Sequence, residues 1–171
     1  MKSKRIAYLS ILTAVAIVLN IFENYLPMPF IAPGAKIGLA NIVTMVCIMS
    51  ISYKDTFLIM ITRIILGAIF SGGLSGFIYS ISGGILSFIF MVIVKEIFKN
   101  KISPIGISVT GAVFHNIGQV IVAIFIIKNV LLINYLPILI IIGTVSGTFI
   151  GYLTIYFNNH FKKISKNFLH I

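Results

Sequence analysis

Charged residues are scarce in this chain of 171 residues, and acidic ones are the scarcest. They make up 9% of the chain against about 25% in soluble proteins, while 59% of its residues are hydrophobic. The mean hydropathy of +1.13 excludes an ordinary soluble domain and predicts a single membrane domain over residues 1–171. The net charge of +10 is typical of a membrane protein with basic loops, so we expect no nucleic acid partner.

Residue types that many enzymes need are also rare. Asp55 is the only aspartate, so no pair of acidic clusters can hold the Mg²⁺ ions that prenyl diphosphate chemistry uses. Cys47, the only cysteine, excludes an intrachain disulfide and a multi-cysteine metal site, and we expect it in the core. No Walker-type phosphate loop occurs in the sequence. We therefore expect no catalysis by this chain alone, no cofactor and no metal.

Apolar runs between polar or Gly/Pro-rich breaks predict an all-α integral membrane protein with six transmembrane helices. A barrel is excluded because the runs lack the alternation of transmembrane strands. On this map ten basic residues fall on one side of the membrane and two on the other, which places both termini in the cytoplasm. The predicted spans cover residues 6–25, 37–53, 56–72, 77–96, 105–127 and 133–157.

One predicted loop is long. Residues 26–36, on the outer side, contain three prolines, which prevent a continuous helix. The segment is either a lid over a binding site or an interfacial connector, with Phe30 and Ile31 dipping into lipid. Both interpretations stay open.

Polar side chains inside the predicted spans lie mostly at the midplane or in the outer half. Such groups are costly in a membrane, so they mark binding sites or structural pairs. A channel would need a polar lining through its full depth, whereas this asymmetry predicts a pocket reached from outside. Most of the groups are hydrogen-bond donors, which favours a ligand with acceptor or anionic groups. The candidate substrate-binding residues are Arg63, His115, Asn116, Gln119, Asn41, Lys36 and Glu23.

Structural roles are the alternative for several of these residues. His115 and Asn116 could hydrogen-bond neighbouring helices without touching a ligand. Arg63 could pair with Glu23, the only acidic residue that can plausibly reach it. A pair of that kind is compatible with ligand binding, so the alternatives are left open.

Small residues recur at four-residue spacing on two spans. Gly143, Gly147 and Gly151 predict a close-packing seam on the sixth span. Ser10 and Ala14 form a second small face, on the cytoplasmic half of the first span. This second face could dock a partner protein.

Several strings together resemble one bacterial family, labelled heptaprenyl diphosphate synthase component I and also called the Gx transporter family. Its members look like the substrate-binding S components of energy-coupling factor transporters. The resemblance covers nearly the whole chain, and its most specific strings are Gly-x-Lys-x-Gly-Leu-Ala-Asn and His-Asn-x-Gly-Gln. The matching segments are residues 33–41, 63–67, 80–84 and 111–119, together with Glu23 and Pro27.

The resemblance implies a six-helix S component in the bacterial cytoplasmic membrane. Such a protein captures a small micronutrient, or here an isoprenoid- or quinone-related precursor, near the outer face. A scaffold membrane protein and two ATPases supply the energy, and Ser10 and Ala14 stand where S components often have an Ala-x-x-x-Ala pair that contacts the scaffold. The family label implies a different role, a non-catalytic membrane subunit of heptaprenyl diphosphate or menaquinone biosynthesis. A structural interaction protein without a ligand is a third possibility.

Overall fold

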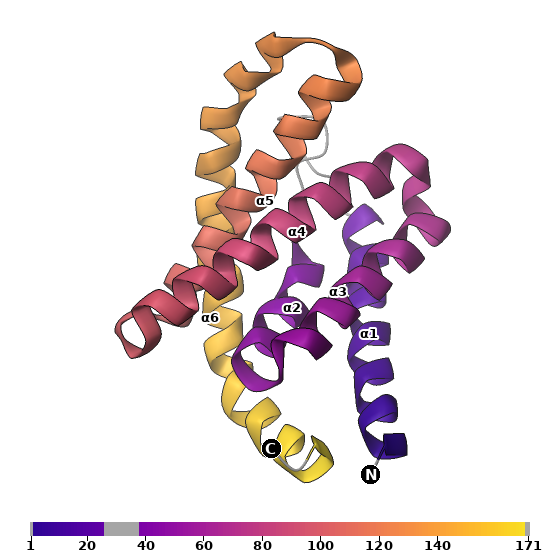
Figure 1. Cartoon of the computed structure of the whole chain (residues 1–171), viewed down its shortest axis with the longest axis vertical. Helices are drawn as coiled ribbons and strands as arrows, with labels where there is room; N and C mark the ends of the chain where they lie inside the picture. The colour runs from indigo at the N-terminus through magenta and orange to yellow at the C-terminus, as the bar shows by residue number, and fades with distance from the viewer. Residues whose placement is uncertain (1, 26–37, 170–171) are drawn as a thin grey trace.

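The computed structural model describes residues 2–25 and 38–169, which form six α-helices, short helical turns and no strand (Figure 1). The prediction of an all-α protein with six helices is confirmed over these residues. The α-helices are α1 (Lys2–Tyr25), α2 (Leu39–Ser50), α3 (Tyr53–Gly67), α4 (Gly73–Phe98), α5 (Pro104–Ile127) and α6 (Leu136–Leu169). The turns are a π-helix, η1 (Ala68–Gly72), and two 3₁₀ helices, η2 (Lys99–Lys101) and η3 (Val130–Tyr135).

Four helical segments of the described chain are long and apolar enough to cross a membrane, which indicates a multi-pass membrane protein. They are Ser3–Glu23, Gly73–Phe98, Pro104–Ile127 and Val130–Asn158.

The other two helices, α2 and α3, are shorter than the spans predicted for them. With 12 residues α2 is about 18 Å long, against a hydrocarbon core of about 30 Å. It ends at Ser50 because Ile51 and Ser52 have extended backbone conformations. The last residues of the third predicted span lie beyond α3, in η1.

The helix α2 lies at the centre of the molecule and packs against α1, α3 and α6 (Figure 1). Seven of its 12 residues are buried and the other five are half-buried, as expected of a helix that is apolar on nearly every face. On one side, Val43 and Cys47 contact Leu12 of α1 in an apolar cluster, so the expectation that Cys47 lies in the core is confirmed. On the other side, Met45 and Ile48 join a second cluster with side chains from α4, α5 and α6.

The antiparallel pair α5 and α6 is held by the predicted glycine seam (Figure 1). A Cβ atom added at Gly151 would lie 2.5 Å from the Cα atom of Ile105, and one added at Gly147 would lie 2.7 Å from the Cα atom of Val109. Backbones can approach this closely only where side chains are missing. The predicted seam on α6 is therefore confirmed.

The first turn of α1 and the last turns of α6 lie at the same end of the molecule (Figure 1). Near that end Arg5 of α1 forms an ion pair with Asp55 of α3, with 2.5 Å between the guanidinium nitrogen and the carboxylate oxygen. Tyr53, also at the start of α3, donates a hydrogen bond from its hydroxyl to Glu96 of α4. These contacts tie α1, α3 and α4 together at one end, while the last turn of α1 lies toward the other.

Candidate functional site

Arg63 is a buried cation in the second half of α3. Its side chain is only 5% exposed, and it donates a hydrogen bond to the Oδ1 atom of Asn41 on α2, over 3.2 Å. Its Nε atom is buried and has no hydrogen-bond acceptor among the residues that the structure describes. Because an unsatisfied charged donor is costly in a membrane, this atom is available for an acceptor that a ligand could bring.

Glu23, in the last turn of α1, is 4% exposed and faces the start of α2. Its carboxylate accepts hydrogen bonds from the backbone N–H groups of Gly38 and Leu39, the second over 3.1 Å. An acidic group at this position also compensates the positive end of the α2 dipole. Gly38 has φ 82°, a left-handed conformation that suits glycine, and it directs the chain into α2.

Glu23 also interacts electrostatically with Arg63. The hydrogen bonds described for the Glu23 carboxylate come from two backbone N–H groups at the start of α2, so a structural pair of Glu23 with Arg63 stays one of the two alternatives. Together the buried Glu23 and Arg63 and the half-buried Asn41 form a polar cluster at the meeting point of α1, α2 and α3. We call these three residues the arginine cluster.

His115 and Asn116, adjacent on α5, face different helices. The imidazole ring of His115 lies against Gly83 of α4, where an added Cβ atom would come within 2.9 Å of the ring. Asn116 is 7% exposed and donates a hydrogen bond from its Nδ2 atom to the backbone oxygen of Leu139 on α6, over 2.6 Å. Asn116 therefore connects α5 to α6, as the structural alternative for this residue expects.

The remaining candidate residues are described only in part. Gln119, one turn beyond His115 on α5, is half-buried. Lys36 and the loop 26–36 fall outside the described residues. The arrangement thus brings three of the seven candidates together at α1, α2 and α3, and it places three more on α5.

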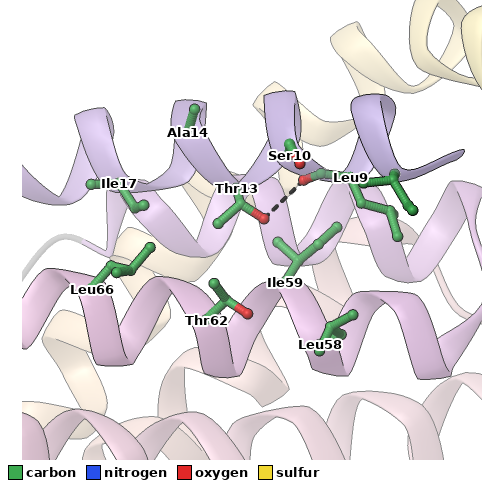
Figure 2. A pocket seen from close by; sticks show the side chains of 10 residues that line it. Leu9, Ser10, Thr13, Ala14, Ile17, Leu58, Ile59, Thr62 and Leu66 are labelled. Atoms are coloured by element: carbon green, nitrogen blue, oxygen red, sulfur yellow. Dashed lines mark hydrogen bonds between the residues drawn. The ribbon is translucent and has the colours of Figure 1, made fainter. Parts of the chain in front are cut away.

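A groove of about 420 Å³ runs between α1 and α3 on the surface of the protein (Figure 2). Ser10 and Ala14, the small residues expected to dock a partner, line it and are exposed. In Figure 2 Thr13 of α1 and Ile59 of α3 point into the space between the two helices. Thr62 of α3 adds a further small side chain, which the sequence reasoning did not single out.

Two polar contacts near the ends of α2 were not anticipated. The bond from the backbone of Gly38 to Glu23 had one sequence signal, the glycine in the string Gly-Leu-Ala-Asn. The second contact is a hydrogen bond from the Lys95 ammonium group on α4 to the backbone oxygen of Ile48. Nothing in the sequence of α4 alone indicates that Lys95 would reach α2, because a lysine near a span end is expected simply to face water.

These features define a multi-pass helical membrane protein with a polar cluster around a buried arginine between its first three helices and a small-residue groove beside them. The chain belongs to the heptaprenyl diphosphate synthase component I family, whose model matches residues 12–157. The family expected from the sequence strings is therefore confirmed. No curated protein and no solved structure matches this chain.

Proposed function

We propose that this chain is the substrate-binding S component of an energy-coupling factor importer in the bacterial cytoplasmic membrane, with both termini in the cytoplasm. It captures a small micronutrient, or an isoprenoid- or quinone-related precursor, from the outer face. The observation that carries this proposal is Arg63, a buried cation with an unused donor inside a membrane protein. The chain itself is not catalytic in this proposal.

The arginine cluster has the chemistry of a binding site for an acceptor or anion. Burying a guanidinium group costs several kcal/mol unless partners compensate it. Asn41 occupies one donor of Arg63, and the carboxylate of Glu23 is shared with backbone N–H groups at the start of α2. A ligand carboxylate, phosphate or carbonyl would give the Nε atom the acceptor that it lacks among the described residues, because guanidinium groups bind such acceptors well.

The position of the arginine cluster supports capture from outside. It is built from the last turn of α1, the first turn of α2 and the second half of α3, away from the end that holds the first turn of α1. With cytoplasmic termini, as the charge distribution predicts, these segments point to the outer face. The pocket predicted from the sequence is proposed to lie at this cluster, with His115, Asn116, Gln119 and Lys36 lining it or ordering it.

Energy for import has to come from partners, since the sequence contains no nucleotide-binding motif. The groove between α1 and α3 is the proposed contact with the scaffold protein. Its small residues Ser10, Ala14 and Thr62 allow a partner helix to approach closely, which favours helix association in membranes.

The first experiment tests the binding site. The protein is purified in detergent without scaffold or ATPases, and native mass spectrometry identifies the small molecule that remains bound. We expect Arg63→Lys, which keeps the charge and lacks Nε, to weaken binding about 10- to 100-fold, the effect of losing a charge-assisted hydrogen bond. Lys128→Gln, which removes an exposed cation at the C-terminal end of α5, is the control and should bind normally.

The double variant Arg63→Ala with His115→Ala is the strictest test of the site assignment. If it binds the small molecule as tightly as the wild type does, the assignment is wrong. The transport role is tested separately by reconstitution with a scaffold protein and two ATPases in vesicles. Uptake should then require ATP and all three partner chains, whereas ligand binding should not.

A second function is favoured by the family membership itself, because the family description names a component of heptaprenyl diphosphate synthase. In that role the chain would be a non-catalytic membrane subunit that positions a separate soluble synthase. Co-purification with such a synthase, and loss of its activity when this chain is deleted, would favour this role. ATP-dependent uptake by the reconstituted complex would favour the importer.

A further inference from the structure

A cavity of about 500 Å³ lies where α2, α4 and α5 meet, away from the arginine cluster. Its polar lining comes from Lys95, Glu96 and Lys99 at the end of α4, and its apolar lining comes from α2, α5 and the preceding linker. The cavity lies at the C-terminal end of α4, where Glu96 contacts Tyr53 at the start of α3. It is therefore at the same end of the molecule as the first turn of α1. From this cavity we infer a binding site for the phosphate group of an anionic ligand, such as a phospholipid headgroup, with Lys99 as its main contact.

Two of the three charged side chains that line this cavity, Glu96 and Lys95, make contacts within the protein. Glu96 accepts the hydrogen bond from the Tyr53 hydroxyl, which directs its carboxylate toward α3. Lys95 donates to the backbone oxygen of Ile48, and its ammonium nitrogen lies 4.9 Å from the centre of the Tyr53 ring. Both residues thus connect α4 to the junction of α2 and α3. The ammonium charge of Lys95 still contributes to the field in the cavity.

Lys99 is different, because it is exposed and makes no hydrogen bond or ion pair with any residue of the described chain. It follows Lys95 by four residues, so two cations border one cavity. The N-terminus of α5 begins nearby at Pro104, and its helix dipole adds a partial positive charge. An anion in the cavity would therefore meet two ammonium groups and a favourable helix end, against the single carboxylate of Glu96.

The backbone of Lys99 determines which residues suit this position. Its φ is 46°, in the left-handed region, where a residue other than glycine, asparagine or aspartate is disfavoured. Asparagine would therefore suit the turn better than lysine does.

These preferences provide a variant that removes the charge without harming the fold. Lys99→Asn deletes the ammonium group and replaces it with a residue tolerant of the left-handed conformation, so its melting temperature should not fall. Lys128→Asn is a matched control, because Lys128 is also exposed, has φ 54° and follows the last turn of a helix. It stands at the opposite end of α5 from the cavity.

The test is a titration of the three detergent-purified proteins with phosphatidylglycerol, phosphatidylcholine or inorganic phosphate, with bound ligand counted by native mass spectrometry. Lys99→Asn should weaken phosphatidylglycerol binding about fivefold, since one basic residue near an anionic headgroup contributes roughly that factor. Lys128→Asn should change it less than about twofold. Phosphatidylcholine, which has no net charge, should bind more weakly to the wild type.

The titration with inorganic phosphate shows whether the bound anion is a lipid headgroup or a free phosphate ion. Binding of inorganic phosphate that depends on Lys99 supports a site for the free ion, whereas Lys99-dependent binding of phosphatidylglycerol alone supports a lipid site. Equal affinities in the wild type and Lys99→Asn for both probes would overturn the inference. It would also be overturned if Lys99→Asn and Lys128→Asn weakened binding equally, because the effect would then come from net charge.

Discussion

The glycine seam between α5 and α6 allows a quantitative prediction for the variant Gly151→Ala. The added methyl group would lie 2.5 Å from the Cα atom of Ile105, and that atom belongs to the backbone and cannot rotate away. Carbon atoms pack best at about 3.5–4.0 Å, so the two helices must separate by roughly 1 Å. Overpacking of this kind costs about 1–3 kcal/mol.

Gly76→Ala on α4 is the matched control for this variant. Gly76 is also helical, but an added Cβ atom there would meet nothing within 4 Å. Both variants gain the better helix propensity of alanine, about 1 kcal/mol, so the difference between them isolates the overpacking. Gly151→Ala should therefore be about 1–3 kcal/mol less stable than Gly76→Ala.

Thermal unfolding in a single detergent measures this difference. For a chain of this length each kcal/mol corresponds to about 2–4 °C in melting temperature, so the Gly151→Ala protein should melt about 2–12 °C below the Gly76→Ala protein. Equal melting temperatures would refute the reasoning, because they would mean that α5 and α6 separate at no cost.

Three further variants test other parts of the molecule. Asn116→Ala should lower stability by about 0.6–2 kcal/mol, the range for a hydrogen bond between membrane helices, measured by thermal unfolding. Ala14→Leu should fill the groove between α1 and α3 and abolish co-purification with a scaffold protein, while the melting temperature stays unchanged. Ile11→Phe, at an exposed residue outside the groove, is the control and should change neither co-purification nor the melting temperature. Asn41→Leu should weaken ligand binding, because Arg63 then loses its partner and its orientation; unchanged affinity would contradict the proposed site.

Much of the fold could be predicted from the sequence, because long apolar runs separated by charged or Gly/Pro-rich breaks determine where membrane helices form. The lengths of α2 and α3 could not be predicted in the same way. Residues 51 and 52 continue the apolar and small pattern of α2 but leave the helix, and no hydropathy signal marks that change. Apolar character indicates burial, and it does not distinguish a helix inside a protein from one in lipid.

The contacts of the candidate site residues could also be predicted only in part from the sequence. The depth of Arg63 and the scarcity of acids made Glu23 one candidate partner for it, and the carboxylate accepts hydrogen bonds from the start of α2, which the sequence does not indicate. His115 and Asn116, however, are one residue apart and face α4 and α6 respectively. The helical period separates their directions by about 100°, but only the packing of the helices decides which neighbour each side chain meets.

The two polar contacts near the ends of α2 have a consequence for assembly in the cell. A helix of 12 residues is too short to insert on its own, and lipid cannot satisfy the backbone groups at its ends. Glu23 accepts a hydrogen bond from a backbone N–H group at the start of α2 and is synthesised before α2. Lys95 donates to a backbone oxygen near the end of α2 and is synthesised only with the last turns of α4. We therefore expect α2 to stay at the membrane surface or in the insertion machinery until α4 has been synthesised. Its final placement follows the arrival of α4, so a truncation before Lys95 should leave α2 accessible to water-soluble labels.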